Sequence, residues 1–229
     1  MSKIIVIIPA FNEADSIIQV LESINSLNLN IDIVVIDDGS YDRTRELVIE
    51  YGVRCLSHPI NCGVGAALIT GLTWSLKQGY EQIVVVDADG QHPASDIPEM
   101  LAELKNCDLV VGVRNWSTYK TSPGRKIAHS FLRIILKFKY GIKIDDVTSG
   151  FRAFRHTSVE RLIPLLSDQY LEDTIMLLIE SSRLKLKLSQ IRVTLKIRMA
   201  GKPSHGVLKS SMRYLSVLVK IILAPRERI

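Results

Sequence analysis

Short apolar runs, each long enough for one strand, recur through the first half of the chain. They alternate with segments whose apolar residues repeat at helical spacing, such as Ile17, Val20, Leu21 and Ile24. Strands that are apolar on both faces are typical of a parallel sheet covered by helices on both sides. The sequence therefore predicts an α/β fold whose ligands bind at the C-terminal ends of the strands. The expected strands are Ile4–Ile8, Ile31–Ile36, Val53–Ser57, Gln82–Val86 and Leu109–Gly112.

The second half has a looser pattern. Its most distinctive segment is a long helix, Gly124–Tyr140, which is basic and amphipathic. Thr148–Phe154 is expected to return to the sheet, and Leu188–Ile197 to be extended. The remaining expected helices are Asp42–Tyr51, Gly65–Gln78, Ser95–Lys105, His156–Leu166 and Asp173–Leu184, with Asn12 as the cap of the first helix.

Length and charge indicate one main domain with a basic end. At 229 residues and 47% hydrophobic content, the chain can bury one sizeable core. The net charge is only +5, but the segment from Ser181 onward contains twelve Lys and Arg residues and a single acid, Glu227. We expect a catalytic domain at residues 1–205 and a basic amphipathic C-terminal helix at 206–229. Its expected partner is an anionic membrane surface rather than nucleic acid.

No signal peptide or transmembrane helix is expected. The apolar run Ile4–Ile8 is ended by Pro9, and the run Tyr214–Ala224 is too short to span a bilayer and contains Lys220. The three cysteines lack metal-ligand spacing and fit a reducing compartment. The expected location is therefore cytoplasmic, with peripheral contact at the cytoplasmic face of the membrane.

Two carboxylates, Asp87 and Asp89, directly follow the apolar strand Gln82–Val86. In extended backbone, residues i and i+2 project to the same side, so both carboxylates can face one cation. Mg²⁺ prefers one or two carboxylates together with phosphate oxygens, which suits a nucleotide-activated substrate. A polar turn with Asp89 and Gly90 as turn residues would explain the same sequence without a metal.

Two further polar turns, Pro9–Glu13 and Asp37–Ser40, follow the first two expected strands. In a parallel sheet the three turns converge on one crevice. Helix caps or local turns would explain each of them separately, but not their coincidence. Other nucleotide-binding folds are disfavoured, because Gly63–Leu68 lacks the third glycine of the dinucleotide fingerprint and no GxxxxGK[ST] loop occurs.

Six short motifs occur in order along nearly the whole chain. They are Ile8–Glu13, Asp37–Thr44, His58 with Asn61 and Gly63–Gly65, Asp87–Pro93, Val111–Arg114 and Thr148–Arg152. This series resembles the successive motifs of the family 2 glycosyltransferases, and within them the dolichol-phosphate mannose synthase branch. The resemblance is specific because all six motifs keep their order.

The resemblance implies a GT-A fold with a mostly parallel sheet flanked by helices, an inverting single displacement, and a nucleotide-sugar donor held by Mg²⁺ or Mn²⁺. It implies Asp87, Asp89 and Gln91 as residues for the diphosphate and metal, with Asp89 also catalytic. Arg114 and Arg198 would face phosphates, which arginine binds bidentately. The other substrate-binding residues that the resemblance implies are Pro9, Phe11, Glu13, Ile36, Asp38, Ala88, Arg125, Lys126 and Ser130.

One motif departs from the family pattern. Where relatives commonly have R-x-x-G-x-S-K, this chain has Arg198-Met-Ala-Gly-Lys-Pro-Ser-His205, with Ser204 at the position of the lysine. Either Lys202 or His205 would have to replace its phosphate contact, and an exposed, unengaged side chain is an equally good explanation for each.

The resemblance thus implies an enzyme that transfers a sugar from GDP-mannose or a UDP-sugar to a polyprenyl or dolichyl phosphate. An alternative within the family is a sugar hydroxyl acceptor in polysaccharide or glycolipid synthesis. Asp173 would then be the general base, although acids are also favoured at helix N-termini by the macrodipole. A nucleotidyltransferase would usually show a Gly-rich, Lys- or Arg-bearing loop where this chain has Pro9–Glu13. A non-catalytic membrane-binding module would not require Asp87 and Asp89.

Overall fold

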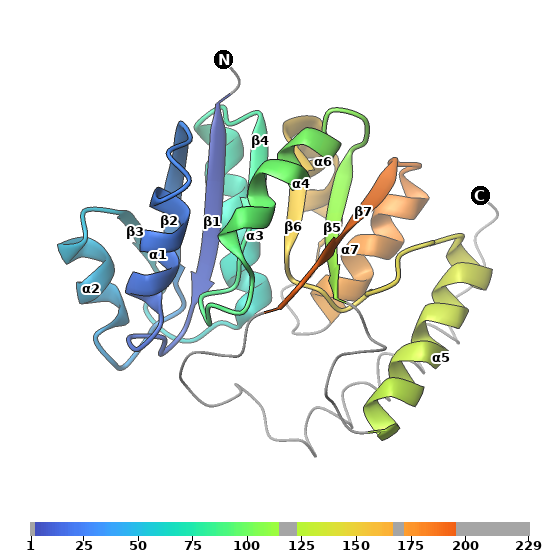
Figure 1. The fold of residues 1–229 in the computed structure, drawn as a ribbon, viewed down its shortest axis with the longest axis horizontal. Coiled ribbons are helices and arrows are strands. Elements are labelled where there is room, and N and C mark those ends of the chain that lie inside the picture. The colour runs from blue at the N-terminus through green and yellow to red at the C-terminus, as the bar shows by residue number, and fades with distance from the viewer. Residues whose placement is uncertain (1–2, 115–122, 167–171, 196–229) are drawn as a thin grey trace.

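The computed structural model describes residues 3–114, 123–166 and 172–195. Their strands form a seven-stranded sheet in the order β3-β2-β1-β4-β6-β5-β7, with helices on both faces (Figure 1). The strands are β1 (Ile4–Ala10), β2 (Ile31–Asp37), β3 (Arg54–Ser57), β4 (Gln82–Val85), β5 (Leu109–Arg114), β6 (Arg152–Arg155) and β7 (Leu188–Val193). The helices are α1 (Ile17–Asn25), α2 (Thr44–Glu50), α3 (Val64–Lys77), α4 (Ile97–Glu103), α5 (Pro123–Tyr140), α6 (His156–Leu162) and α7 (Glu172–Arg183), with 3-10 turns at Ala94–Asp96 and Ile163–Leu165.

Strand β1 lies between β2 and β4 and is parallel to both. Its pairing with β2 ends with Ala10 opposite Asp37, and its pairing with β4 ends with Ile7 opposite Val85. The loops that follow these three strands therefore leave from the same edge of the sheet (Figure 1). This is the convergence of polar turns that the sequence predicted.

The sheet is not wholly parallel, because β6 runs antiparallel to both β4 and β5. The sequence predicted a strand from Thr148 onward, but the segment before Arg152 is a loop. The side chains in this loop bind their own backbone: Thr148 N donates to Asp146 Oδ1 (3.2 Å) and Phe151 N donates to Ser149 Oγ (3.3 Å). Such local bonds replace the ladder bonds of a strand, which explains why the strand starts late.

Both faces of the sheet are packed against apolar side chains. Along β1, Ile5 and Ile7 belong to the cluster on the α3 side, whereas Val6 and Ile8 belong to the cluster on the α1 side. All four side chains are fully buried. Gly71 lets α3 approach β1 closely, because a Cβ at that position would lie 2.5 Å from Ile7 Cγ2. The apolar strand runs in the sequence are explained by this burial on two sides.

The prediction that Asn12 caps the first helix was wrong. Helix α1 begins at Ile17, after Ser16. Asn12 instead adopts a left-handed backbone conformation, with φ 55°, which asparagine tolerates better than most residues. Its Oδ1 accepts a hydrogen bond from the backbone N–H of Tyr41 (2.8 Å). Among the described residues, no helix is long and apolar enough to cross a membrane.

Candidate active site

The loops after β1 and β2 are joined by hydrogen bonds. The backbone N–H of Asn12 donates to Ser40 Oγ, and that of Glu13 donates to Thr44 Oγ1, both at 2.9 Å. Phe11, which the sequence predicted to contact the nucleoside, meets Tyr41 edge to face with ring centroids 6.0 Å apart. Tyr41 is 85% exposed, so this ring pair is open to solvent on the side of Tyr41. The two rings offer an aromatic surface of the kind against which a nucleobase packs.

Ser16 connects the loop after β1 to the turn after β4. Its buried hydroxyl donates to the backbone carbonyl of Ala88 (2.8 Å) and also lies 3.0 Å from Glu13 Oε2. Two residues that the sequence predicted to contact substrate, Glu13 and Ala88, are therefore neighbours in space.

Asp87 and Asp89 lie on the turn after β4, and both are half-exposed. The backbone N–H of Gln91 donates to Asp89 Oδ1 (3.0 Å). Asp87 lies close against Gly150, where a Cβ would clash with Asp87 Oδ1 at 2.8 Å, so the glycine lets the carboxylate approach the backbone. Oxygen donors that are accessible to solvent, as the 43% exposed side chain of Asp87 is, fit a hard divalent cation such as Mg²⁺ or Mn²⁺.

His92 supports this turn from the protein side. Its ring stacks on Phe151, with centroids 5.0 Å apart and planes inclined by 15°. Its Nδ1 accepts a hydrogen bond from the backbone N–H of Asp87 (3.3 Å) and lies 3.6 Å from Asp87 Oδ2. The sequence placed His92 only within a motif, whereas the structure gives it a role in positioning Asp87.

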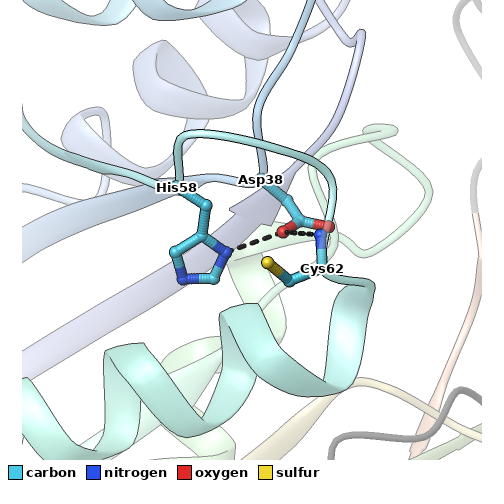
Figure 2. A group of neighbouring side chains, drawn as sticks. All are labelled: Asp38, His58 and Cys62. Atoms are coloured by element: carbon cyan, nitrogen blue, oxygen red, sulfur yellow. Dashed lines mark hydrogen bonds and ion pairs between the residues drawn. The ribbon is translucent and has the colours of Figure 1, made fainter.

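Asp38 is buried and is the centre of a hydrogen-bonded cluster after β2, in which His58 is half-buried and Cys62 is exposed (Figure 2). Its Oδ1 lies 2.7 Å from His58 Nδ1 and accepts a hydrogen bond from the backbone N–H of Cys62 (3.0 Å). Its Oδ2 accepts one from the backbone N–H of Gly63 (2.7 Å), immediately before α3. The other ring nitrogen of His58 lies 2.9 Å from Thr70 Oγ1. Asp38 thus holds residues 58–63 against the end of β2.

The ligand atoms of Asp38, His58 and Cys62 all lie within 4.8 Å of one another, as a metal site would require. However, the buried Asp38 carboxylate is already hydrogen-bonded to His58 and to two backbone N–H groups. These bonds explain the cluster without a metal. Contact of Asp38 with a nucleoside stays a prediction, and such a contact would share the carboxylate with these donors.

Asp146 is a fully buried acid that the sequence analysis did not single out. It forms an ion pair with Arg114 at the end of β5. Its Oδ1 accepts a hydrogen bond from Thr148 Oγ1 (2.9 Å) and lies 3.5 Å from Nε2 of His129 in α5. Asp146 therefore holds the guanidinium of Arg114, the residue predicted to face phosphates, from the buried side.

Several causes act on the pKa of Asp146. Burial alone would raise it, but the hydrogen bond with His129 and the positive charge of Arg114 outweigh burial and hold the pKa well below its usual range. The carboxylate therefore stays charged at neutral pH. The only sequence signal for this site was an Asp-Asp pair shortly before the Thr148 motif.

The remaining predicted residues differ in how they are placed. The Ile36 side chain is fully buried in the core, so only its backbone is available to a nucleoside. Ser130 is exposed and Lys126 is half-exposed on α5, at the helix end that follows β5. Pro9 is half-exposed at the end of β1. The side chains of Arg125 and Asp173, together with all of Arg198 and the 206–229 segment, lie outside the described part of the structure.

A family comparison identifies this arrangement. Residues 5–163 match the family described as glycosyl transferase family 2. The chain belongs to glycosyl transferase family 2. It is therefore an enzyme of the glycosyltransferase class. The loops at the ends of β1, β2 and β4 form its candidate active site.

Curated relatives of this glycosyltransferase include three lipid-phosphate sugar transferases. It is 30% identical over 212 residues to UDP-N-acetylglucosamine–dolichyl-phosphate N-acetylglucosaminyltransferase of Methanococcus voltae, covering 83% of this chain and 84% of the relative. It is 30% identical to polyprenol monophosphomannose synthase of Mycolicibacterium smegmatis, covering 70% of this chain and 64% of the relative. It is 35% identical to dolichol-phosphate mannosyltransferase of Pyrococcus furiosus, covering 69% and 47%. The chain thus spans less than two thirds of the last two relatives.

Solved structures with a similar fold include glucosyl-3-phosphoglycerate synthase from Mycobacterium tuberculosis in complex with Mn²⁺, UDP and phosphoglyceric acid. The TM-score is 0.74 at 22% identity, covering 98% of this chain and 80% of that chain. At this identity the likeness shows the fold alone. Together with the family match it confirms the predicted GT-A type of α/β fold.

The buried ion pair of Asp146 gives a prediction about stability. We expect Asp146→Asn to lower the free energy of unfolding at pH 7 by about 3–5 kcal/mol, because it leaves the Arg114 charge without its buried partner. Since folding lowers the pKa of Asp146, its contribution is present above the unfolded pKa of about 3.9 and is lost as pH falls below it. The difference between wild type and variant should therefore shrink on acidification. Urea unfolding at several pH values measures this.

Asp145→Asn is the matched control. Asp145 is the adjacent residue, and its side chain is 47% exposed in an ion pair with Arg133. Exposed pairs of this kind contribute about 0–1 kcal/mol. Equal losses in the two variants would contradict a special role for the buried carboxylate.

Proposed function

We propose that this glycosyltransferase moves a sugar from a nucleoside diphosphate to a polyprenyl or dolichyl phosphate, with inversion at the anomeric carbon. The observation that carries the proposal is the half-exposed pair Asp87 and Asp89, which lies where the ends of β1, β2 and β4 converge. The names of the three relatives above support the lipid-phosphate acceptor. GDP-mannose and UDP-sugars are the candidate donors.

The donor would bind with its base near Phe11 and Glu13 and its diphosphate near the turn after β4. Asp87, Asp89 and Gln91 would hold Mg²⁺ or Mn²⁺, which would neutralise charge on the departing diphosphate. Gly150, which has no Cβ, lets the Asp87 carboxylate take its position on this turn. Support for the metal comes from the oxygen donors themselves and from a solved structure of the same fold that contains Mn²⁺ and UDP.

The acceptor would attack from the side opposite the diphosphate. A bond forms between a phosphate oxygen of the acceptor and the anomeric carbon while the bond from that carbon to the diphosphate oxygen breaks. Arg114 carries a positive charge at the end of β5, and its tie to buried Asp146 restricts its motion. A guanidinium fixed in this way can bind a phosphate without a large loss of side-chain entropy.

A lipid-linked acceptor requires the enzyme to work at a membrane surface. We place it at the cytoplasmic face, in peripheral contact through basic segments of the chain. The basic C-terminal segment 206–229 and helix α5 are the predicted contact regions.

Replacing Asp89 by Asn tests the proposal directly. We expect Asp89→Asn to reduce sugar transfer to polyprenyl phosphate by at least about 10²-fold, the size typical for losing one group that stabilises charge in the transition state. The substitution removes an anionic ligand but preserves shape, so the melting temperature should change little. Transfer of labelled sugar from GDP-mannose and from UDP-sugars, with Mn²⁺ or with EDTA, measures the effect.

Asp32→Asn is the control for this experiment. Asp32 accepts a hydrogen bond from Tyr80 (2.8 Å) near the opposite end of β2, and asparagine can keep that bond. The control should retain wild-type activity. Near wild-type turnover by Asp89→Asn without added metal would contradict the metal role of the pair.

Asp173, within α7, distinguishes the two kinds of acceptor. A sugar hydroxyl must lose a proton as it attacks, and a positioned base typically contributes about 10²- to 10⁴-fold. A phosphate has a second pKa near 6, so its oxygen is largely ionised at pH 7 and needs no base. We therefore expect Asp173→Asn to lose roughly tenfold or less in transfer to polyprenyl phosphate.

Glu172→Gln, one residue earlier in the same helix, controls for the loss of an acid at the helix N-terminus. A loss of about a thousandfold or more in Asp173→Asn alone, in folded protein that still binds donor, would favour the hydroxyl acceptor instead.

A further inference from the structure

His129 is a polar residue on the buried face of helix α5. Its neighbours on that face at helical spacing, Leu132 and Leu136, are fully buried in the core, and His129 itself is only 4% exposed. Burying an imidazole costs free energy unless a polar group receives it. Asp146 is such a group, since its Oδ1 lies 3.5 Å from His129 Nε2. Because an ionised carboxylate can only accept, this arrangement requires a proton on Nε2.

The two carboxylate oxygens of Asp146 face different elements. Oδ2 pairs with Nε of Arg114 at the end of β5, whereas Oδ1 faces His129 of α5. Oδ1 also accepts hydrogen bonds from the backbone N–H (3.2 Å) and the hydroxyl (2.9 Å) of Thr148. Thr148 Oγ1 in turn lies 3.4 Å from Arg114 Nη2. The orientation of the Asp146 carboxylate therefore sets the orientation of the Arg114 guanidinium, and His129 helps to fix it.

A second contact, one turn further along α5, fastens the same loop. Arg133 Nη1 donates to Asp145 Oδ1 (2.9 Å). Asp145 is also bonded to Gln190 of β7, through its backbone N–H to Oε1 (2.8 Å) and through Oδ2 to Nε2 (2.9 Å). Helix positions four residues apart lie on one face, so neighbouring acids of the loop bind α5 from an exposed and a buried side. The buried contact, between His129 and Asp146, is the one that leads directly to the Arg114 ion pair.

Helix α5 also carries residues predicted to contact substrate. Lys126 comes three residues before His129, and Ser130 comes one residue after it, whereas Arg114 lies on β5. Groups from two elements can bind one phosphate together only while the elements keep a fixed relation. A misplacement of about 1 Å can cost up to about 10²-fold in rate. The contact of His129 with Asp146 is placed to maintain that relation.

We propose that His129 is a positioning residue for acceptor binding, which acts through Asp146 and keeps Arg114 aligned with helix α5. In this role His129 touches no substrate. The inference deepens the proposed function and rests on it for the phosphate acceptor.

Two substitutions of His129 test the proposal. His129→Gln keeps an N–H donor near the place of Nε2, whereas His129→Leu removes the donor and keeps an apolar side chain. Transfer is measured with geranyl phosphate, a soluble isoprenyl phosphate, in Mn²⁺ and with a donor that wild type uses. His129→Leu should raise the KM for geranyl phosphate roughly 3- to 30-fold, the size typical for a residue that is coupled to a site without contacting its ligand. The KM for the donor should stay near the wild-type value, and His129→Gln should restore most of the loss.

His156→Leu and Arg133→Gln are the matched controls. His156 Nδ1 lies 2.8 Å from Tyr80 O, next to the start of β4 and thus at the opposite edge of the sheet from the candidate active site. His156→Leu should leave both KM values unchanged. Arg133→Gln breaks the exposed ion pair with Asp145 and should raise the KM for geranyl phosphate less than His129→Leu does. Equal effects of His129→Gln and His129→Leu, or equal rises in the KM for donor and acceptor, would overturn the proposal.

Urea unfolding separates the proposal from the proposed function. If His129 and Arg114 are joined through Asp146, the losses in free energy of unfolding from His129→Leu and Arg114→Gln will be less than additive in the double variant. Additive losses would overturn the proposal. If His129→Leu does not fold, His129→Asn replaces it, because its shorter amide withdraws the donor from Asp146. If wild type transfers sugar to no isoprenyl phosphate, the proposed acceptor is wrong, and the unfolding measurements alone decide whether His129 positions Arg114.

Discussion

The parallel pairing of β1 with β2 and β4 is the constraint on which the candidate active site depends. It continues beyond the strands, where the backbone N–H of Asp38 donates to Ala10 O (2.8 Å) and that of Val86 donates to Ile7 O (3.0 Å). Both faces of β1 are buried, so a register slip of one residue would exchange the side chains of its two faces. The polar loops after the three strands are thereby held in a fixed relation.

The acids in and near the candidate active site divide into two kinds. Asp38 and Asp146 are buried and accept hydrogen bonds from the protein, which fixes the loop at residues 58–63 and the guanidinium of Arg114. Asp87 and Asp89 are half-exposed on the turn after β4. A buried carboxylate that the protein already satisfies is poorly suited to bind a cation, whereas a half-exposed one is well suited. Burial thus separates the positioning acids from the candidate metal ligands.

The sequence predicted those features that depend on local pattern. The apolar runs located the strands, and the one-residue spacing of Asp87 and Asp89 placed both on one turn. The role of Asp146 could not be predicted in the same way, because its partners Arg114 and His129 come from β5 and α5 and meet only in the folded chain. The left-handed conformation of Asn12 was missed for a similar reason: its side chain is held by the loop after β2. The roles of individual residues toward substrate stay predictions.

The dependence of nucleotide binding on metal tests most directly whether the candidate active site holds a metal-bound diphosphate. Thermal unfolding of the wild-type protein would be followed with UDP, GDP and the corresponding monophosphates, in Mn²⁺ or in EDTA. A ligand at a hundred times its Kd stabilises the folded state by about 2.7 kcal/mol. We expect such stabilisation from at least one nucleoside diphosphate in Mn²⁺, with most of it lost in EDTA and little from the monophosphate. Equal stabilisation with and without metal, or by mono- and diphosphate alike, would contradict the proposed site.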